Sequence, residues 1–119
     1  MSSTAHEDRP ARTVADLRPG DVLLLGRLSL QCPRRARPFL TISAPCRRCR
    51  TTHSHGWTRP PGAMDAVSHK TAHCHNGGGG YYVGLDQAAE DHNRRVLADY
   101  AEALRRWERQ QQDQAAASA

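Results

Sequence analysis

The chain has 119 residues, a formal net charge of +5 at pH 7 and only 5% aromatic residues. This length leaves room for one domain, and so few aromatic side chains leave little net free energy from core burial, so an additional cross-link would help. No stretch approaches the roughly 18 apolar residues of a membrane helix, and no secretory leader is recognisable. We therefore predict a cytoplasmic protein without membrane contact, whose four cysteines stay reduced.

The positive charge is concentrated in the middle of the chain. Residues 22–64 contain eight arginines and no acidic residue, whereas the segments on either side are each slightly acidic. By contrast, residues 1–12 are small or charged, and residues 110–119 contain no large apolar side chain. We expect these two ends to be disordered tails around a single domain of residues 13–109.

Two strands are predicted in the first half of the domain. In DVLLLGRLSLQ, residues 21–31, Leu24 and Leu28 share one parity with other apolar residues, while the polar residues from Arg27 onward take the other. This alternation indicates a strand with one covered face. After an arginine-rich loop, FLTISA at residues 39–44 is a second strand, which Pro45 is expected to end.

The next segment, residues 47–64, has no apolar periodicity, which predicts a long loop with at most a short extended piece through TTHSH. A hairpin is expected after it, because the β-formers AVSHKTAHC and YYVGL flank the glycine-rich NGGGG.

The C-terminal sequence DQAAEDHNRRVLADYAEALRRWERQQ, residues 86–111, predicts a helix with Asp86 as N-cap. Its apolar residues recur at helical spacing and form a stripe that should pack on the sheet: Ala89, Val96, Tyr100, Leu104 and Trp107. The expected fold is therefore α+β, with a small antiparallel sheet, a zinc-ribbon-like Cys/His site and one long C-terminal helix.

The stretch PCRRCRTTHSHGW, residues 45–57, contains a Cys-x2-Cys turn. Such a turn directs two thiolates at one ion, as in structural zinc sites with four Cys or His ligands. No second Cys-x2-Cys follows, but five of the seven histidines lie between residues 53 and 75, with Cys74 among them. His55 is preferred to His53 because its longer loop can swing back more easily. The predicted zinc ligands are Cys46, Cys49, His55 and Cys74, with His53 and His73 as substitutes.

A catalytic site is less consistent with the sequence. APCRRC matches half of the nucleoside deaminase pattern, but the required upstream His-x-Glu or Cys-x-Glu is missing. His-x-His elements of metallohydrolases need further acidic ligands, and Asp65 is the only acid nearby. We therefore predict no catalytic residue, and a small metalloenzyme is the third alternative for function.

The combination of APCRRCRTTHSHGW, SHKTAHC and GYYVGLD resembles small proteins of actinobacteria and their phages and plasmids. In these proteins a Cys-x2-Cys, a His-x-His-Gly and an Ala-His-Cys recur in that order. The resemblance covers about residues 38–86, and it implies a zinc-ribbon-like domain without an established activity. It carries over to Cys46, Cys49, His53, His55, His73 and Cys74. The sequence departs from the pattern at Arg50, where zinc knuckles often have a glycine that readily adopts positive φ.

The first functional hypothesis is a structural-zinc module that binds nucleic acid through arginine-rich loops, with binding that weakens steeply as salt rises. The candidate contacts are Arg34, Arg35, Arg37, Arg47, Arg48, Arg50, Arg59 and Trp57. Trp57 would either stack on a base or cover the loop. The second hypothesis is a zinc-stabilised protein-interaction adaptor of mobile-element origin, which uses the C-terminal helix stripe or the sheet edge.

Overall fold

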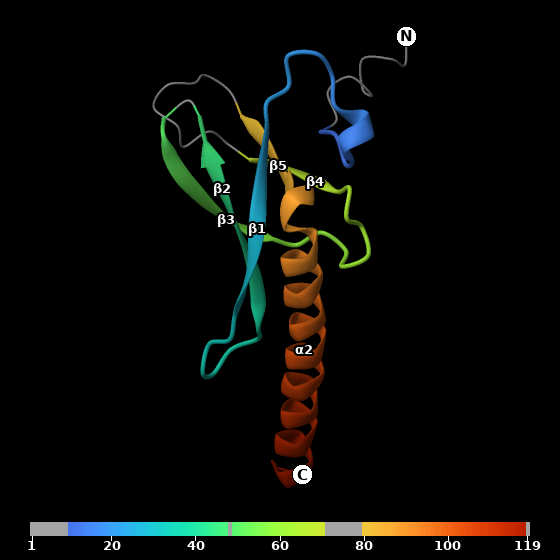
Figure 1. Ribbon diagram of the computed structural model, residues 1–119. Helices are drawn as coiled ribbons and strands as arrows, with labels where there is room; N and C mark the ends of the chain where they lie inside the picture. The colour runs from blue at the N-terminus through green and yellow to red at the C-terminus, as the bar shows by residue number, and fades with distance from the viewer. Residues whose placement is uncertain (1–9, 48, 71–79, 119) are drawn as a thin grey trace.

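The structure is a computed structural model that describes residues 10–47, 49–70 and 80–118. In this part a five-stranded sheet is followed by one long helix (Figure 1), which is the predicted α+β architecture. The sheet order is β3-β2-β1-β5-β4. The strands are β1 (Leu23–Gln31), β2 (Phe39–Cys46), β3 (Thr51–Trp57), β4 (Val67–Lys70) and β5 (Tyr81–Leu85).

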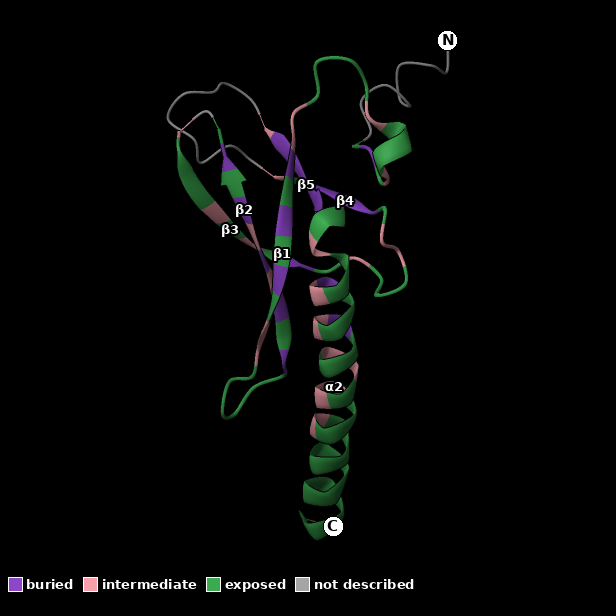
Figure 2. Ribbon diagram, viewed as in Figure 1, coloured by how far each residue is buried: buried purple, intermediate pink, exposed green. Residues whose placement is uncertain are grey.

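Strand β1 lies at the centre of the sheet and has the predicted alternation, with Leu24 and Leu28 buried and Arg27 exposed (Figure 2). It pairs antiparallel with β2 and parallel with β5. The sheet is therefore mixed, and not wholly antiparallel as expected. The β4–β5 pair lies on the side of β1 opposite to β2 and β3, and β5, the strand next to β1, runs in the same direction as β1.

Strand β2 continues through Pro45 to Cys46, although the proline was expected to end it. Beyond Ser43, β2 no longer pairs with β1 and has only β3 beside it. A proline is tolerated where a strand has one open side, because its missing N–H then removes no ladder hydrogen bond there.

Strand β3 occupies residues that we expected to be mostly loop, and it pairs with β2 along its whole length. The sequence of β3 lacks a clear apolar alternation because its inward positions are His53, His55 and Trp57, of which only the last is strongly apolar. The sheet also curls, since the Lys70 Nζ of β4 donates a hydrogen bond of 3.2 Å to the Gly56 carbonyl of β3.

The helical region begins as predicted, because the Asp86 side chain accepts a hydrogen bond of 3.0 Å from the Ala88 amide. A short 3-10 helix, η2 (Gln87–Ala89), leads into α2 (Glu90–Ser118). Helix α2 continues past residue 109, so the chain that we expected to be a C-terminal tail is helical to Ser118. No helix of the described part is both long and apolar enough to cross a membrane.

Only the first half of α2 packs on the sheet (Figure 2). Its buried residues are Asn93 and Leu97, while Val96 and Tyr100 of the predicted stripe pack on the margin of the core. The Asn93 Oδ1 accepts a hydrogen bond of 2.9 Å from the Leu28 amide of β1. Helix α2 therefore satisfies a backbone group of the central strand just beyond the point where β5 ends.

The N-terminal segment lies along the β4 edge of the sheet. Ala11 is buried and its amide donates to the Tyr82 hydroxyl at 2.9 Å, and the Arg12 carbonyl accepts from the Val67 amide at 3.0 Å. The domain thus extends into the residues 1–12 that were expected to be a tail. A 3-10 helix, η1 (Val14–Asp16), follows, and hydrogen bonds from the Arg12 amide and then from Thr13 hold the pKa of the Asp16 carboxyl below its ordinary 3.8.

Candidate metal centre

The Cys-x2-Cys turn connects the end of β2 to the start of β3. The Arg50 amide donates to the Cys46 carbonyl at 2.9 Å, which closes the turn. Arg50 itself has φ 58°, the left-handed conformation that glycine adopts without steric cost. The turn therefore has the positive φ found in zinc knuckles, although an arginine stands at that position.

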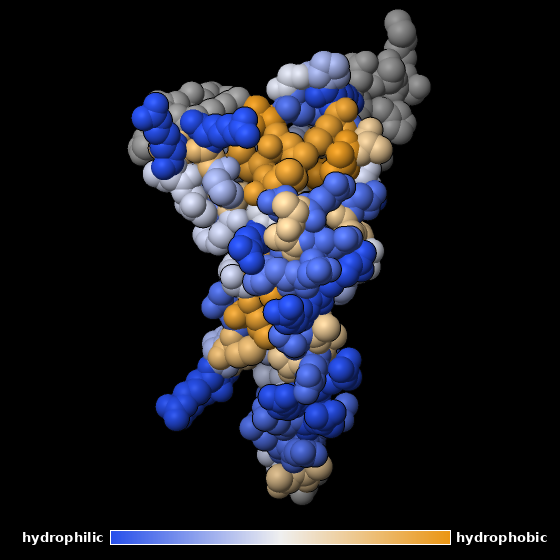
Figure 3. Space-filling view, viewed as in Figure 1, coloured by the Kyte–Doolittle hydropathy of each residue, from blue (hydrophilic) through white to orange (hydrophobic). Residues whose placement is uncertain are grey.

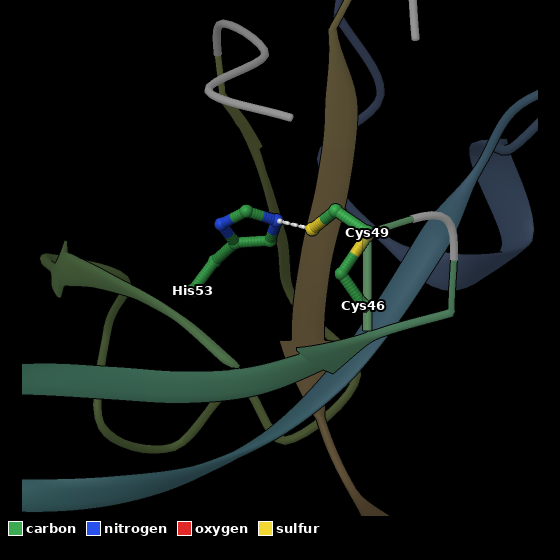
Figure 4. Close-up of side chains that lie close together, drawn as sticks. All are labelled: Cys46, Cys49 and His53. Atoms are coloured by element: carbon green, nitrogen blue, oxygen red, sulfur yellow. Dashed lines mark hydrogen bonds between the residues drawn. The ribbon is translucent and has the colours of Figure 1, made fainter. Parts of the chain in front are cut away.

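Two thiols and one imidazole converge above this turn (Figure 4). The ligand atoms of Cys46, Cys49 and His53 all lie within 4.8 Å of one another. The Cys49 Sγ is 3.2 Å from the His53 Nε2 and 3.1 Å from the Thr51 hydroxyl. Cys46 is buried, whereas Cys49 and His53 are half-buried.

These separations suit a tetrahedral metal ion. Zinc bonds of about 2.3 Å to sulfur and about 2.0 Å to nitrogen place neighbouring ligand atoms roughly 3.5–3.8 Å apart. The Cys49–His53 contact is already close to this spacing, and the outer limit of 4.8 Å exceeds it by an amount that side-chain rotation can remove. The group could therefore hold a metal ion with little movement of the backbone.

The histidine beside the cysteines is His53, not the preferred His55. In the register of β2 and β3, His53 lies opposite Ala44 and His55 lies opposite Ile42. At about 3.3 Å per residue, these positions are roughly 7 Å and 13 Å along the strand from Cys46. Once residues 51–57 form a strand, a longer loop is no longer available to bring His55 back.

Tyr81, which no motif in the sequence marks as a site residue, lies beside both histidines. Its hydroxyl is hydrogen bonded to the His55 Nε2 at 2.5 Å, and its ring stacks on His53 with centroids 5.6 Å apart. Because β3 and β5 are not neighbours in the sheet, only the curl of the sheet brings these residues together. No local sequence signal could have shown this contact.

The remaining predicted ligands, Cys74 and His73, lie outside the described residues, as does Arg48. The described chain resumes at residue 80 and enters β5 at Tyr81, next to His53. Cys32, which was not a predicted ligand, is exposed at the end of β1.

The predicted arginine contacts are divided between the two ends of β2. Arg34, Arg35 and Arg37 are exposed on the β1–β2 loop, whereas Arg47 and Arg50 are exposed at the turn between β2 and β3. The eight residues of β2 separate these groups by about 25 Å. Arg59 follows β3, and its Nε is buried with no hydrogen-bond partner in the described part.

The arginines of the acid-free region are not neutralised within the described structure. The ion pairs between described residues are Arg94–Glu90 and Arg106–Glu102, which both lie on α2. Trp57, in contrast, is 4% exposed and belongs to the hydrophobic core. Of the two roles expected for Trp57, burial in the core is incompatible with stacking on a base, because the ring would have to leave the core.

Comparisons with models of protein families, with curated proteins and with solved structures each give no match. The residues and their geometry therefore carry the functional assignment.

Proposed function

We propose that the protein is a structural-zinc module that associates with nucleic acid through its arginines. The observation that carries the zinc assignment is the convergence of Cys46, Cys49 and His53 at a turn with a left-handed residue. Two thiolates and an imidazole are typical ligands of structural zinc. We propose Cys74 as the fourth ligand, because it would complete a closed Cys3His shell.

The position of the site also supports a structural role. It joins the end of β2 to the edge strand β3, beside the first residue of β5. A metal ion there would hold together three strands that the curl of the sheet brings to one place. We propose that the protein acts in a reducing compartment such as the cytoplasm, where thiols stay available as metal ligands.

Metal content of the purified protein, measured by elemental mass spectrometry, tests this assignment. The wild-type protein should contain one zinc ion per chain, and Cys46→Ser, Cys49→Ser and His53→Ala should each lose it. Cys32→Ser and His55→Ala are matched controls that should retain zinc, because their side chains lie outside the Cys46, Cys49 and His53 group. Retention of zinc by Cys46→Ser would overturn the assignment, and retention by Cys74→Ser would exclude Cys74 as the fourth ligand.

Association with nucleic acid is supported by the distribution of charge. Residues 22–64 contain eight arginines and no acid, and none of the described ones pairs with an acidic group of the described structure. Such arginines can neutralise phosphates and release the counterions that surround nucleic acid.

A salt titration of binding to random-sequence duplex and single-stranded DNA tests this part. Binding should weaken linearly on a plot of log affinity against log salt concentration, with a slope set by the number of phosphates neutralised. Absence of measurable binding to either form at low salt would contradict nucleic-acid association and leave the zinc assignment unaffected.

A further inference from the structure

We infer that Trp107 and the β1–β2 loop, residues 32–38, form a binding site for single-stranded nucleic acid. The inference rests on the nucleic-acid association proposed above, and it names the surface and the form of the partner. In this site the loop arginines contact phosphates and the Trp107 ring stacks on a base.

The orientation of Trp107 follows from the docking of α2 on β1. Asn93 points toward β1, since it is fully buried and bonded to Leu28. Trp107 is 14 residues further along, and at about 100° per residue it returns to within about 40° of the direction of Asn93. Trp107 therefore faces the side of the helix on which β1 and its loop lie, about 21 Å beyond Asn93.

The loop reaches a similar level. From Leu28, β1 continues for three residues, or about 10 Å, before the loop extends further in the same direction. Figure 1 shows β1 and α2 running the same way from their contact, and in that view the loop ends level with the outer half of the helix. The loop and the outer half of α2 are thus two arms that extend from the same place, the contact between α2 and β1.

The helix face around Trp107 is suited to bases. Leu104 and Gln111 lie three residues before and four residues after it, on the same face, and Gln114 continues that face. At about 100° per residue, Arg106 and Glu108 flank this face at equal angles from Trp107, and the other charged residues between 104 and 114 lie further round the helix. Trp107 and Leu104 are half-buried, beyond the residues that pack on the core. Figure 3 shows hydrophobic surface where the two arms separate.

The loop is suited to phosphates. Arg34, Arg35 and Arg37 are exposed and form no ion pair within the described structure. Pro33 restricts the backbone near the start of the loop, and Pro38, which is buried, anchors its end. The arginines are therefore presented on a short, restrained loop and attract an anionic strand.

A single strand fits this combination better than a duplex. An aromatic ring can stack only on a base whose face is exposed, and duplex bases are already stacked on both faces. Arginines tracking the backbone and an aromatic platform for the bases are the usual means of binding single strands.

Tryptophan fluorescence during titration with an oligothymidylate of about 15 nucleotides tests the inference. The chain has two tryptophans, so Trp57→Phe leaves Trp107 as the reporter and Trp107→Phe leaves the buried Trp57. Fluorescence of the wild-type protein and of Trp57→Phe should be quenched, and that of Trp107→Phe should change little. If Trp57→Phe does not fold, comparison of the quenching of the wild-type protein with that of Trp107→Phe still tests the inference. Trp107→Ala should weaken binding by ~5- to 100-fold.

A charge comparison tests the other half of the site. The triple variant Arg34→Gln, Arg35→Gln, Arg37→Gln should lower the salt slope by about 2, at ~0.7 per phosphate contact on a single strand. The control triple variant Arg95→Gln, Arg105→Gln, Arg109→Gln removes the same charge from other faces of α2 and should leave the slope nearly unchanged.

The outcomes separate this inference from the broader function. Binding of oligothymidylate without quenching in Trp57→Phe, or with unchanged affinity in Trp107→Ala, would overturn the site while nucleic-acid association stands. Equal weakening by the two triple variants would also overturn it. Absence of binding to both DNA forms in the wild-type protein would remove the proposed nucleic-acid function as well.

Discussion

Arg50 adopts a left-handed backbone conformation with φ 58°, directly after the two cysteines of the candidate metal centre. For a residue with a Cβ atom this conformation costs roughly 1–2 kcal/mol. The cost persists because the Arg50 amide closes the turn on Cys46, which places Cys49 beside His53.

Arg50→Gly should therefore stabilise the zinc-loaded protein. Removal of the steric cost outweighs the larger unfolded-state entropy of glycine, about 0.5–1 kcal/mol, and leaves a net gain of roughly 0.5–1 kcal/mol. The melting temperature in the presence of excess zinc measures it. Arg47→Gly is the matched control, because Arg47 does not have positive φ, and it should lower the melting temperature. A loss of stability in Arg50→Gly equal to that of the control would contradict the prediction.

Among the elements, α2 depends on a polar contact with β1 as well as on apolar packing. Asn93 is fully buried, accepts from the Leu28 amide and donates to the Gly26 carbonyl at 3.4 Å. His92 adds a hydrogen bond of 2.8 Å to the Leu28 carbonyl. The first turns of the helix thus replace a neighbouring strand along this part of β1.

Asn93→Ala should destabilise the protein by about 2–3 kcal/mol, because it leaves the buried Leu28 amide without its partner. Denaturant unfolding monitored by circular dichroism measures the change. Arg95→Ala, at an exposed position two residues later, is the control and should change stability by less than about 0.5 kcal/mol. Similar stability of the two variants would show that the contact has no net effect.

Gly26 sets the distance between β1 and β2. A Cβ atom there would lie 2.7 Å from the Ser43 carbonyl oxygen and 2.7 Å from a side-chain carbon of Ile42. Gly26→Ala should cost about 1–3 kcal/mol, because a backbone atom cannot rotate away. Gly62→Ala, where a Cβ atom meets nothing within 4 Å, is the control for thermal melting and should be nearly neutral or stabilising.

For the whole molecule, the proposed zinc ion would stabilise a fold with little reserve of stability. Its core contains few aromatic residues, and among the described residues the outer half of α2 contributes none to that core. Structural zinc supplies on the order of 10 kcal/mol, as much as the usual net stability of a domain.

Removal of zinc with a strong chelator should therefore unfold the sheet. The expected result is loss of the near-ultraviolet circular dichroism signal and of the cooperative melting transition, both restored when zinc is added back. Cys46→Ser should behave like the chelated protein and should not respond to the chelator. A metal-free wild-type protein with an unchanged melting curve would refute a structural role for the ion.

The sequence by itself determined the elements whose signals are local. Residues close together in the sequence predict three of these features: the alternation in β1, the pairing of β4 with β5, and the cap of the C-terminal helix at Asp86. The same holds for the Cys46–Cys49 turn, since its spacing alone brings two thiols together.

The tertiary structure decided which residues meet across the sheet. The register of β3 on β2 selects His53 over His55, the curl of the sheet brings Tyr81 to both histidines, and burial removes Trp57 from the surface. The length of β2 separates the arginines of the β1–β2 loop from those at the turn after β2, although all of them belong to one acid-free stretch of the sequence. These outcomes depend on pairings between distant segments, which the spacing of residues along the chain does not specify.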